Sequence, residues 1–166
     1  MQITRWTRRF ALSALVVTLF TVAAFAAPGN AREIERGRYL VTVGGCNDCH
    51  TEGFAPSAGK VPQARWLTGS SLGSRGDWGT TYPANLRLYM QGLNADEWVR
   101  RARALETRPP MPWFVLREIK EADLRAMHAF IRSLGPAGEP APPYLPPGQE
   151  PKGPVILFPG PPPGAK

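Results

Sequence analysis

Cysteine and histidine are scarce in this sequence, with two of each among 166 residues. A structural zinc site needs four ligands, and beyond Cys46, Cys49 and His50 the sequence offers only His128, far along the chain. This scarcity disfavours zinc binding. The chain is also too short for two ordinary domains that each bury a core, so we expect one compact domain with extensions.

Long apolar runs are rare too, and the clearest one lies near the N-terminus. Arg5, Arg8 and Arg9 precede an almost wholly apolar stretch at 10–23, and residues 24–26 read Ala-Phe-Ala. This order is typical of an export signal at residues 1–26, cleaved after Ala26. Because 10–27 approaches the roughly 18 apolar residues that can cross a bilayer, an uncleaved membrane anchor is the alternative.

Acidic residues are fewer than basic ones, 13 against 20, and the net charge is +7. Residues 1–26 hold three arginines and no acid, so their removal lowers the charge to +4. A modest positive field can speed docking onto an acidic partner or an anionic membrane, but nothing here indicates nucleic-acid binding. Arg100, Arg101, Arg103 and Arg108 form a basic cluster, which is either a solvated helix face or a partner-docking surface.

The two cysteines and one histidine stand together as Cys46-Asn47-Asp48-Cys49-His50, the C-x-x-C-H pattern of haem attachment. Thiols at this spacing can add to the two vinyl groups of a haem, and the adjacent histidine then faces the iron. We therefore expect one covalent haem c on Cys46 and Cys49, with His50 as an iron ligand. A thioredoxin-type redox pair, a zinc site and a plain disulfide are the alternatives.

The sixth iron ligand separates the function classes. A methionine sulfur closes the iron and raises its potential, whereas an open position permits peroxide or oxygen chemistry. Met111 lies in Pro109-Pro110-Met111-Pro112, which cannot be helical, and it is the expected ligand. Met127 falls on an apolar helical stripe, Met90 lies in a weakly helical stretch, and His128 would make a bis-histidine site.

Apolar periodicity predicts a helix at 32–44, one that follows Asn94 and stops before Pro109, and one at 121–134. Gly37 in the first helix costs about 1 kcal/mol relative to alanine, so we expect a second helix to approach it closely. Residues 53–85 lack a sustained period and predict a loop over the haem edge. Its possible propionate donors are Arg75, Trp78, Tyr82 and Asn85.

The C-terminal residues 136–166 include 12 prolines among 31 residues, a composition that cannot form helix or sheet and favours extended chain. We therefore expect a cytochrome domain at 27–135 and a separate extended tail at 136–166. Removing such a tail should leave the melting behaviour nearly unchanged, because it would bury little apolar surface.

The order of these features resembles the class I cytochrome c family. The resemblance covers residues 32–134 and rests on Gly37-Arg38-Tyr39-Leu40, C-x-x-C-H, the segment 78–86 and Pro110-Met111-Pro112-Trp113. Within that family the chain is similar to single-haem bacterial cytochromes and to the cytochrome subunits of periplasmic dehydrogenases, although those subunits usually carry three haem motifs and this chain has one. Another departure is Lys120, where a serine or threonine helix cap is usual.

The resemblance implies an all-α class I fold of three to four short helices around the haem, with Gly37 against Phe130 or its neighbours. It also implies a periplasmic electron carrier, not an enzyme, whose partners are a dehydrogenase, an oxidase or another cytochrome. The alternatives are a small peroxidase-like haem enzyme and a gas-binding haem sensor, both of which need an open or labile sixth position.

Overall fold

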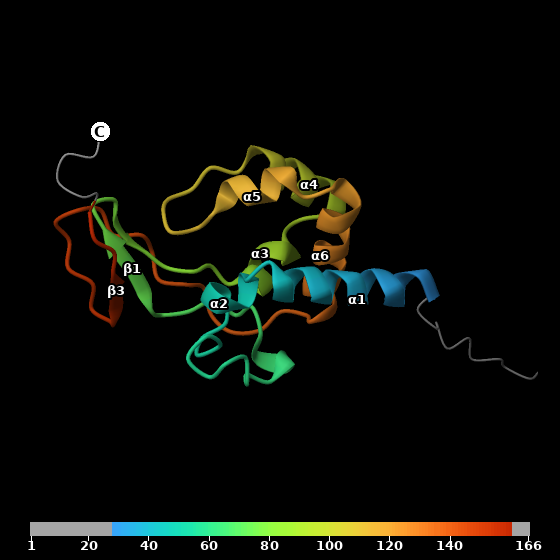
Figure 1. Cartoon of the computed structure of the whole chain (residues 1–166), viewed down its shortest axis with the longest axis horizontal. Coiled ribbons are helices and arrows are strands. Elements are labelled where there is room, and N and C mark those ends of the chain that lie inside the picture. The colour runs from blue at the N-terminus through green and yellow to red at the C-terminus, as the bar shows by residue number, and fades with distance from the viewer. Residues whose placement is uncertain (1–27, 161–166) are drawn as a thin grey trace, which may run out of the picture.

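Helices α1 (Pro28–Val43) and α6 (Glu121–Ser133) cross each other at the centre of the molecule (Figure 1). The computed structural model describes residues 28–160. Gly37 lies at the crossing, where a Cβ atom on it would stand 1.9 Å from the Ala126 carbonyl oxygen and 2.8 Å from Phe130 Cβ. The expected contact between Gly37 and the Phe130 region is therefore confirmed, and it explains a glycine in mid-helix.

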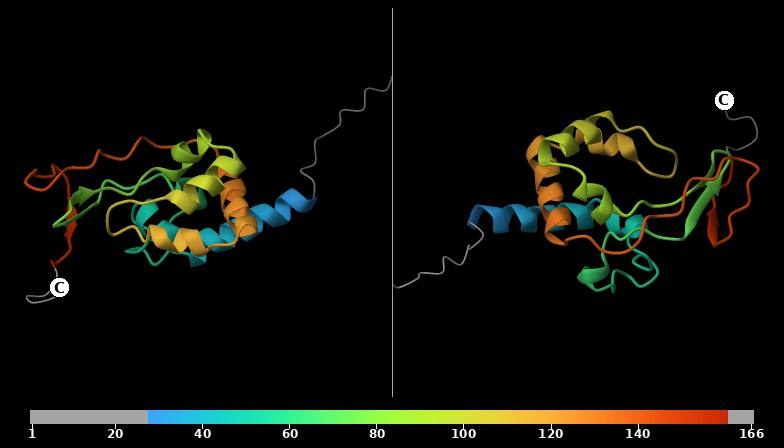
Figure 2. Two further views of the ribbon diagram at one scale, coloured as in Figure 1. Left: turned by 90° about the horizontal axis from the view of Figure 1, so that it is seen from above. Right: turned by 180° about the vertical axis from the view of Figure 1, so that it is seen from behind.

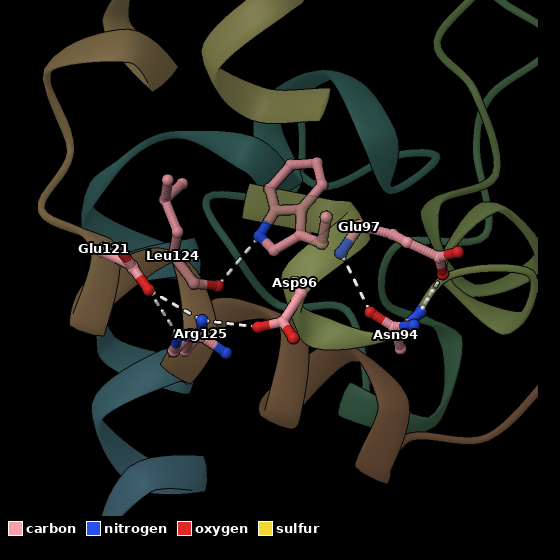
Figure 3. Close-up of polar contacts among 7 residues, drawn as sticks. Asn94, Asp96, Glu97, Glu121, Leu124 and Arg125 are labelled. Carbon is pink, nitrogen blue, oxygen red and sulfur yellow. Dashed lines mark hydrogen bonds and ion pairs between the residues drawn. The ribbon is translucent and has the colours of Figure 1, made fainter. Parts of the chain in front are cut away.

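Helix α4 (Ala95–Ala104) packs on α6, and Arg125 of α6 donates to Asp96 of α4 at 2.6 Å (Figure 3). A second set of hydrogen bonds fixes the start of α4. Asn94 Oδ1 accepts from the Glu97 amide at 2.9 Å, and Glu97 Oε2 accepts from the Asn94 amide at 2.8 Å, which completes a capping box. The buried Trp98 donates from Nε1 to the Leu124 carbonyl at 2.8 Å. The helix predicted after Asn94 is therefore confirmed with its cap.

Three further helices are short: α2 (Cys46–His50), α3 (Leu86–Gln91) and α5 (Trp113–Glu118). A 3-10 turn, η1, covers Gln63–Arg65. The expected helical architecture is confirmed, but the described residues hold six α-helices where three to four were expected. A helix of five or six residues spans less than two turns and leaves too little periodicity to read from the sequence.

The core lies between α1, α3, α4 and α6. Arg87 is an unusual polar member, 5% exposed, and its guanidinium donates to the carbonyls of Gly135 (2.6 Å), Ala64 (2.7 Å) and Leu134. The buried apolar cluster comprises Val41, Trp66, Leu67, Met90, Trp98, Ala102, Leu116, Leu124, Met127, Phe130 and Ile131. Arg87 thus supplies the donors that the end of α6 needs.

A small sheet lies at one end of the molecule, with strand order β2-β1-β3. β1 (Gly73–Gly76) and β2 (Gly79–Thr81) form an antiparallel hairpin, and β3 (Val155–Leu157) pairs in parallel with β1. Figure 2 shows from two further sides that the C-terminal segment runs from the end of α6 to this sheet. The expectation that residues after 136 cannot form sheet is therefore wrong, because four consecutive residues without proline, 155–158, are enough to pair.

Within residues 28–160, no helix combines the length and apolar character needed to cross a membrane. The expected export signal or anchor at 1–26 lies outside the described residues.

Candidate functional site

A glycine turn joins α1 to the cysteine-bearing helix α2. Gly45 caps α2 with a φ of 69°, in the left-handed region that favours glycine. The turn places Cys46, half-buried against the core cluster, and Cys49, exposed, on one short helix with His50 at its end. Cys46 and Cys49 form no disulfide with each other. Their sulfurs and the His50 imidazole come from one five-residue helix, as covalent haem attachment requires.

The environment of the thiols argues against a redox-active pair. Burial raises the pKa of Cys46 to about 11, against an opposing backbone hydrogen bond and with smaller upward effects from the charges of Asp48 and Cys49. Burial also raises the pKa of Cys49, again with help from Asp48. Reactive C-x-x-C cysteines have lowered pKa values and an electropositive setting. In the described part of the chain no three side chains of His, Cys, Asp or Glu gather as a metal-ion site, which also disfavours zinc.

His50 is held in place by the segment that leads into α3. Its Nδ1 lies 2.7 Å from the Ala84 carbonyl oxygen, and because a carbonyl only accepts, Nδ1 must carry the proton. Nε2 is then the unprotonated nitrogen that can bind a metal. Burial lowers the pKa of His50, and the bond to Ala84 acts in the opposite direction. Both geometry and burial therefore favour a neutral imidazole with Nε2 available for iron.

A buried polar chain fixes the other side of this turn. Asn47, fully buried, accepts from the Thr51 hydroxyl at 2.7 Å, and the same hydroxyl accepts from the Leu67 amide at 2.7 Å. The Gly69 amide donates to the His50 carbonyl at 2.8 Å. A Cβ on Gly69 would stand 3.0 Å from the Pro83 carbonyl oxygen, so the 67–70 segment fits closely beside the 83–85 segment that holds the imidazole.

The three described methionines occupy different environments. Met90 and Met127 are core residues, 1% and 3% exposed. Met111 lies in the non-helical segment 105–112 between α4 and α5, which we call the Met111 segment. Its side chain is half-buried against the core cluster. This segment projects toward the same end of the molecule as α2 and the sheet (Figures 1 and 2). Thr81 holds it by donating from Oγ1 to the Pro109 carbonyl at 2.8 Å.

The stretch 81–84, from the last residue of β2 toward α3, thus contacts both His50 and the segment that carries Met111. Thr81 bonds the Met111 segment and Ala84, three residues later, bonds His50. Two thiols for covalent attachment, an imidazole with a free Nε2 and a thioether on a separate segment are the kinds of groups that a six-coordinate haem c requires. The residues present therefore fit this cofactor.

The four expected propionate donors are not equivalent. Arg75 makes a two-pronged ion pair with Glu150 of the C-terminal segment. Asn85 donates both amide hydrogens to the carbonyls of Ala137 (2.8 Å) and Glu139 (3.1 Å) and caps α3 with its oxygen. Tyr82 is half-buried near Gly73. Trp78 has a buried indole Nε1 without a protein partner, so this N–H is an unused hydrogen-bond donor.

His128 and the arginine cluster lie elsewhere. His128, on α6, bonds the Leu93 carbonyl at 2.9 Å and faces a surface pocket shared with residues of α1 and α4. Arg103 donates to the Arg117 carbonyl, and Arg108 lies over the Tyr144 ring. At least these two arginines are therefore engaged within the protein, unlike members of a purely solvated helix face.

Sequence reasoning missed three contributors to the site: Ala84, Thr81 and Tyr144. Ala84 acts through its backbone carbonyl, which any residue would supply, so no side-chain signal exists. Thr81 and Tyr144 act through contacts across 28 and 66 positions of chain, which local patterns do not reveal.

A family model described as "Cytochrome c" matches residues 34–135. Neither a curated protein nor a solved structure matches the chain.

Proposed function

Because the chain belongs to the cytochrome c family, we propose that it is a single-haem electron carrier. Family membership implies a covalently bound haem c and an electron-transfer role. The finer proposal is that Cys46 and Cys49 hold one haem and that His50 and Met111 ligate its iron. The haem supplies the one-electron redox chemistry when bound, and the protein tunes it.

The observation that carries the proposal is the contact between His50 Nδ1 and the Ala84 carbonyl at 2.7 Å. A metal-ligating histidine normally donates its other ring N–H to a carbonyl or carboxylate, which fixes the tautomer and increases the basicity of the ligating nitrogen. Ala84 performs this role with a rigid backbone group. Because Thr81, three residues earlier, restrains the Met111 segment, one stretch of chain supports both proposed ligands.

Met111 is the proposed sixth ligand because its surroundings differ from those of the other methionines. Met90 and Met127 sit inside the apolar core, where they fill space between helices. Met111 stands on a proline-rich segment whose shape is restricted before any ligand binds. A sulfur on such a segment can ligate iron at a low cost in conformational entropy.

Trp78 is the proposed propionate donor. Its Nε1 is buried and unpaired within the protein, and a buried N–H without an acceptor costs about 1–3 kcal/mol. A propionate oxygen would remove that cost. Tyr82 is a second candidate from the same segment, whereas the side chains of Arg75 and Asn85 are already engaged.

The enzyme and sensor alternatives need an open or exchangeable sixth position and, for a peroxidase, an acid–base group beside it. His128 is the remaining histidine, and its ring bonds Leu93 on the α4–α6 side of the molecule. Within residues 28–160, no specific contact favours either alternative.

Three matched methionine variants test the ligand assignment. Met111→Leu should abolish the weak near-infrared sulfur-to-iron band of the oxidised protein while covalent haem remains. Met90→Leu and Met127→Leu should both keep the band, because a swap of similar volume in the core costs under about 1.5 kcal/mol and leaves the fold intact. A wild-type protein without the band, or one that readily binds carbon monoxide when reduced, would contradict His/Met ligation.

We further propose that the protein is exported and works in the periplasm with redox partners such as a dehydrogenase, an oxidase or another cytochrome. The support is the signal-like order of residues 1–26 and the haem motif. Mass spectrometry of the exported protein should give a chain that begins at Ala27. A chain that retains residues 1–26 and sediments with membranes would instead indicate an anchor.

A further inference from the structure

The C-terminal segment folds back over the β1–β2 hairpin. The Thr80 amide donates to the Leu145 carbonyl at 2.8 Å, and the Leu145 amide donates to the Thr80 carbonyl at 3.0 Å. The Tyr144 hydroxyl donates to the Trp78 carbonyl at 2.8 Å. The two chain segments are therefore joined by three hydrogen bonds within a few residues.

Glycine is required where the two segments cross. Gly79 has a φ of 97°, and a Cβ on it would stand 2.2 Å from the Leu145 carbonyl oxygen. Neither the conformation nor the space admits another residue without rearrangement. The hairpin sequence is thus matched to the C-terminal segment that covers it.

The Met111 segment is tied to the same place. The guanidinium of Arg108 lies 3.7 Å from the centre of the Tyr144 ring, and the Pro109 carbonyl accepts from Thr81. Tyr144 precedes Leu145 and Thr81 follows Thr80, so both contacts adjoin the Thr80–Leu145 pair. The hairpin, the C-terminal segment and the Met111 segment therefore meet at this pair. Pro109 and Arg108, which make the contacts, precede Met111 by two and three residues.

In the described part of the chain, the other polar side-chain contact of residues 106–110 is the ion pair of Glu106 with Arg117 at 3.0 Å. Residues 106–110 are all exposed, so little apolar burial holds them. The prolines at 109, 110 and 112 lack amide hydrogens and cannot take part in helical bonding. The contacts made by Thr81 and Tyr144 therefore contribute much of the restraint on the position of residues 108–110.

We propose that Tyr144 is a positioning residue for Met111: the C-terminal segment, through this ring, holds the 108–112 segment where its sulfur ligates iron. The inference rests on the proposed His50/Met111 ligation. Its consequence is that the C-terminal segment sets how readily an external ligand replaces the methionine sulfur. Loss of the Tyr144 contact should release the segment without touching the haem attachment at Cys46 and Cys49.

Imidazole titration of the oxidised holoprotein tests this inference. Tyr144→Ala should bind imidazole about three- to tenfold more tightly than wild type, the range that loss of a close cation–π contact allows. Arg108→Gln, an exposed substitution, should give a similar gain by itself. Tyr144→Phe keeps the ring over Arg108 and should stay closer to wild type. Combining Tyr144→Ala with Arg108→Gln should add little, because the two residues share one contact.

Tyr39→Ala is the matched control. Tyr39 is also a tyrosine beside an arginine, with the Arg36 guanidinium 5.5 Å from its ring centre, but it lies on α1 and is 51% exposed. Its removal should leave imidazole affinity unchanged.

The outcomes separate the inference from the proposed function. If wild type has the near-infrared band and Arg108→Gln and Tyr144→Ala both bind imidazole with wild-type affinity, the positioning role of Tyr144 is wrong. If Tyr144→Ala does not accumulate with haem, Arg108→Gln alone decides. If wild type lacks the band, or Met111→Leu keeps it, the ligation itself is wrong.

Discussion

Gly37 is the residue on which the packing of α1 against α6 depends. A Cβ there would stand 1.9 Å from the Ala126 carbonyl oxygen, which belongs to the rigid backbone of a helix. Gly37→Ala should therefore destabilise the protein by about 2 kcal/mol or more, because overpacking outweighs the roughly 1 kcal/mol that alanine gains in a helix. Urea denaturation monitored by circular dichroism measures the difference.

Gly92→Ala provides the control for this substitution. Gly92 follows α3 with a φ of −84°, and no atom lies within 4 Å of the Cβ it would acquire. This variant should be as stable as wild type or slightly more stable. Equal destabilisation by both variants would show that the α1–α6 contact is not the cause.

Asp123 gives the stability a defined dependence on pH. Arg36 donates two hydrogen bonds to it (2.9 and 3.2 Å), and this pairing lowers the pKa of Asp123 below its usual value near 3.8, against a smaller opposing effect of burial. A lowered pKa in the folded state means that the stabilisation is present above the unfolded-state value and is lost as the pH falls through the folded-state pKa.

Melting temperatures of wild type and Asp123→Asn should therefore differ at pH 5–7, with wild type the more stable. The difference should shrink as the pH falls below about 4. Glu35→Gln is a suitable comparison, because Glu35 pairs with Arg38 inside α1 and does not connect two helices. A difference between wild type and Asp123→Asn that is constant from pH 7 to pH 3 would exclude the Arg36 pairing as its source.

Individual site residues could be predicted from the sequence when they belong to a motif or setting that few other functions share. Cys46, Cys49 and His50 form a motif with few other uses, and Met111 differs from Met90 in its proline-rich setting. Ala84 could not be found, because a backbone carbonyl carries no side-chain signature. The engagement of Asn85 with Ala137 and Glu139 joins residues more than 50 positions apart, and nothing local to either segment indicates it.

At the scale of elements, helices with local signals were predictable and short elements were not. The capping box at the start of α4 and the apolar stripe of α6 are encoded within about one helix length. In contrast, α2, α3 and α5 span five or six residues, which is too short for an apolar period to show, although Asn85 caps α3. The β1–β3 pairing joins segments about 80 residues apart, so it depends on tertiary structure.

A better capping residue at the start of α6 should increase the stability of the protein. Lys120 occupies the cap position and makes no capping hydrogen bond through its side chain. Lys120→Ser should stabilise the protein by about 0.5–1 kcal/mol, because a serine oxygen can accept from a free amide in the first turn. Thermal melting should show the increase, whereas Lys60→Ser, in the loop after α2, should leave the melting temperature unchanged. No increase for Lys120→Ser would mean that water already satisfies those amides equally well.

For the whole molecule, the contacts of the C-terminal segment are the feature that composition did not indicate. Composition predicted a domain at 27–135 and an independent tail, yet residues 137–158 contact the hairpin, Asn85 and Arg75. Proline content alone misleads here because proline blocks pairing only at the positions it occupies. Residues 155–158 and the pair Tyr144-Leu145 supply the amides and side chains that the surrounding prolines lack, so the segment belongs to the folded unit.

Stepwise truncation should therefore lower the melting temperature, contrary to the expectation from composition. Ending the chain after Glu150 removes β3 and the Phe158 ring beside Trp78 and should cost roughly 3–8 °C. Ending it after Glu139 also removes Tyr144 and Leu145 and should cost more, while the Asn85 contacts at 137 and 139 remain. Haem should still attach in both, because the α1–α6 core and the C-x-x-C-H turn do not include the deleted residues. Equal melting temperatures for wild type and both truncated proteins would show that these contacts do not stabilise the fold in solution.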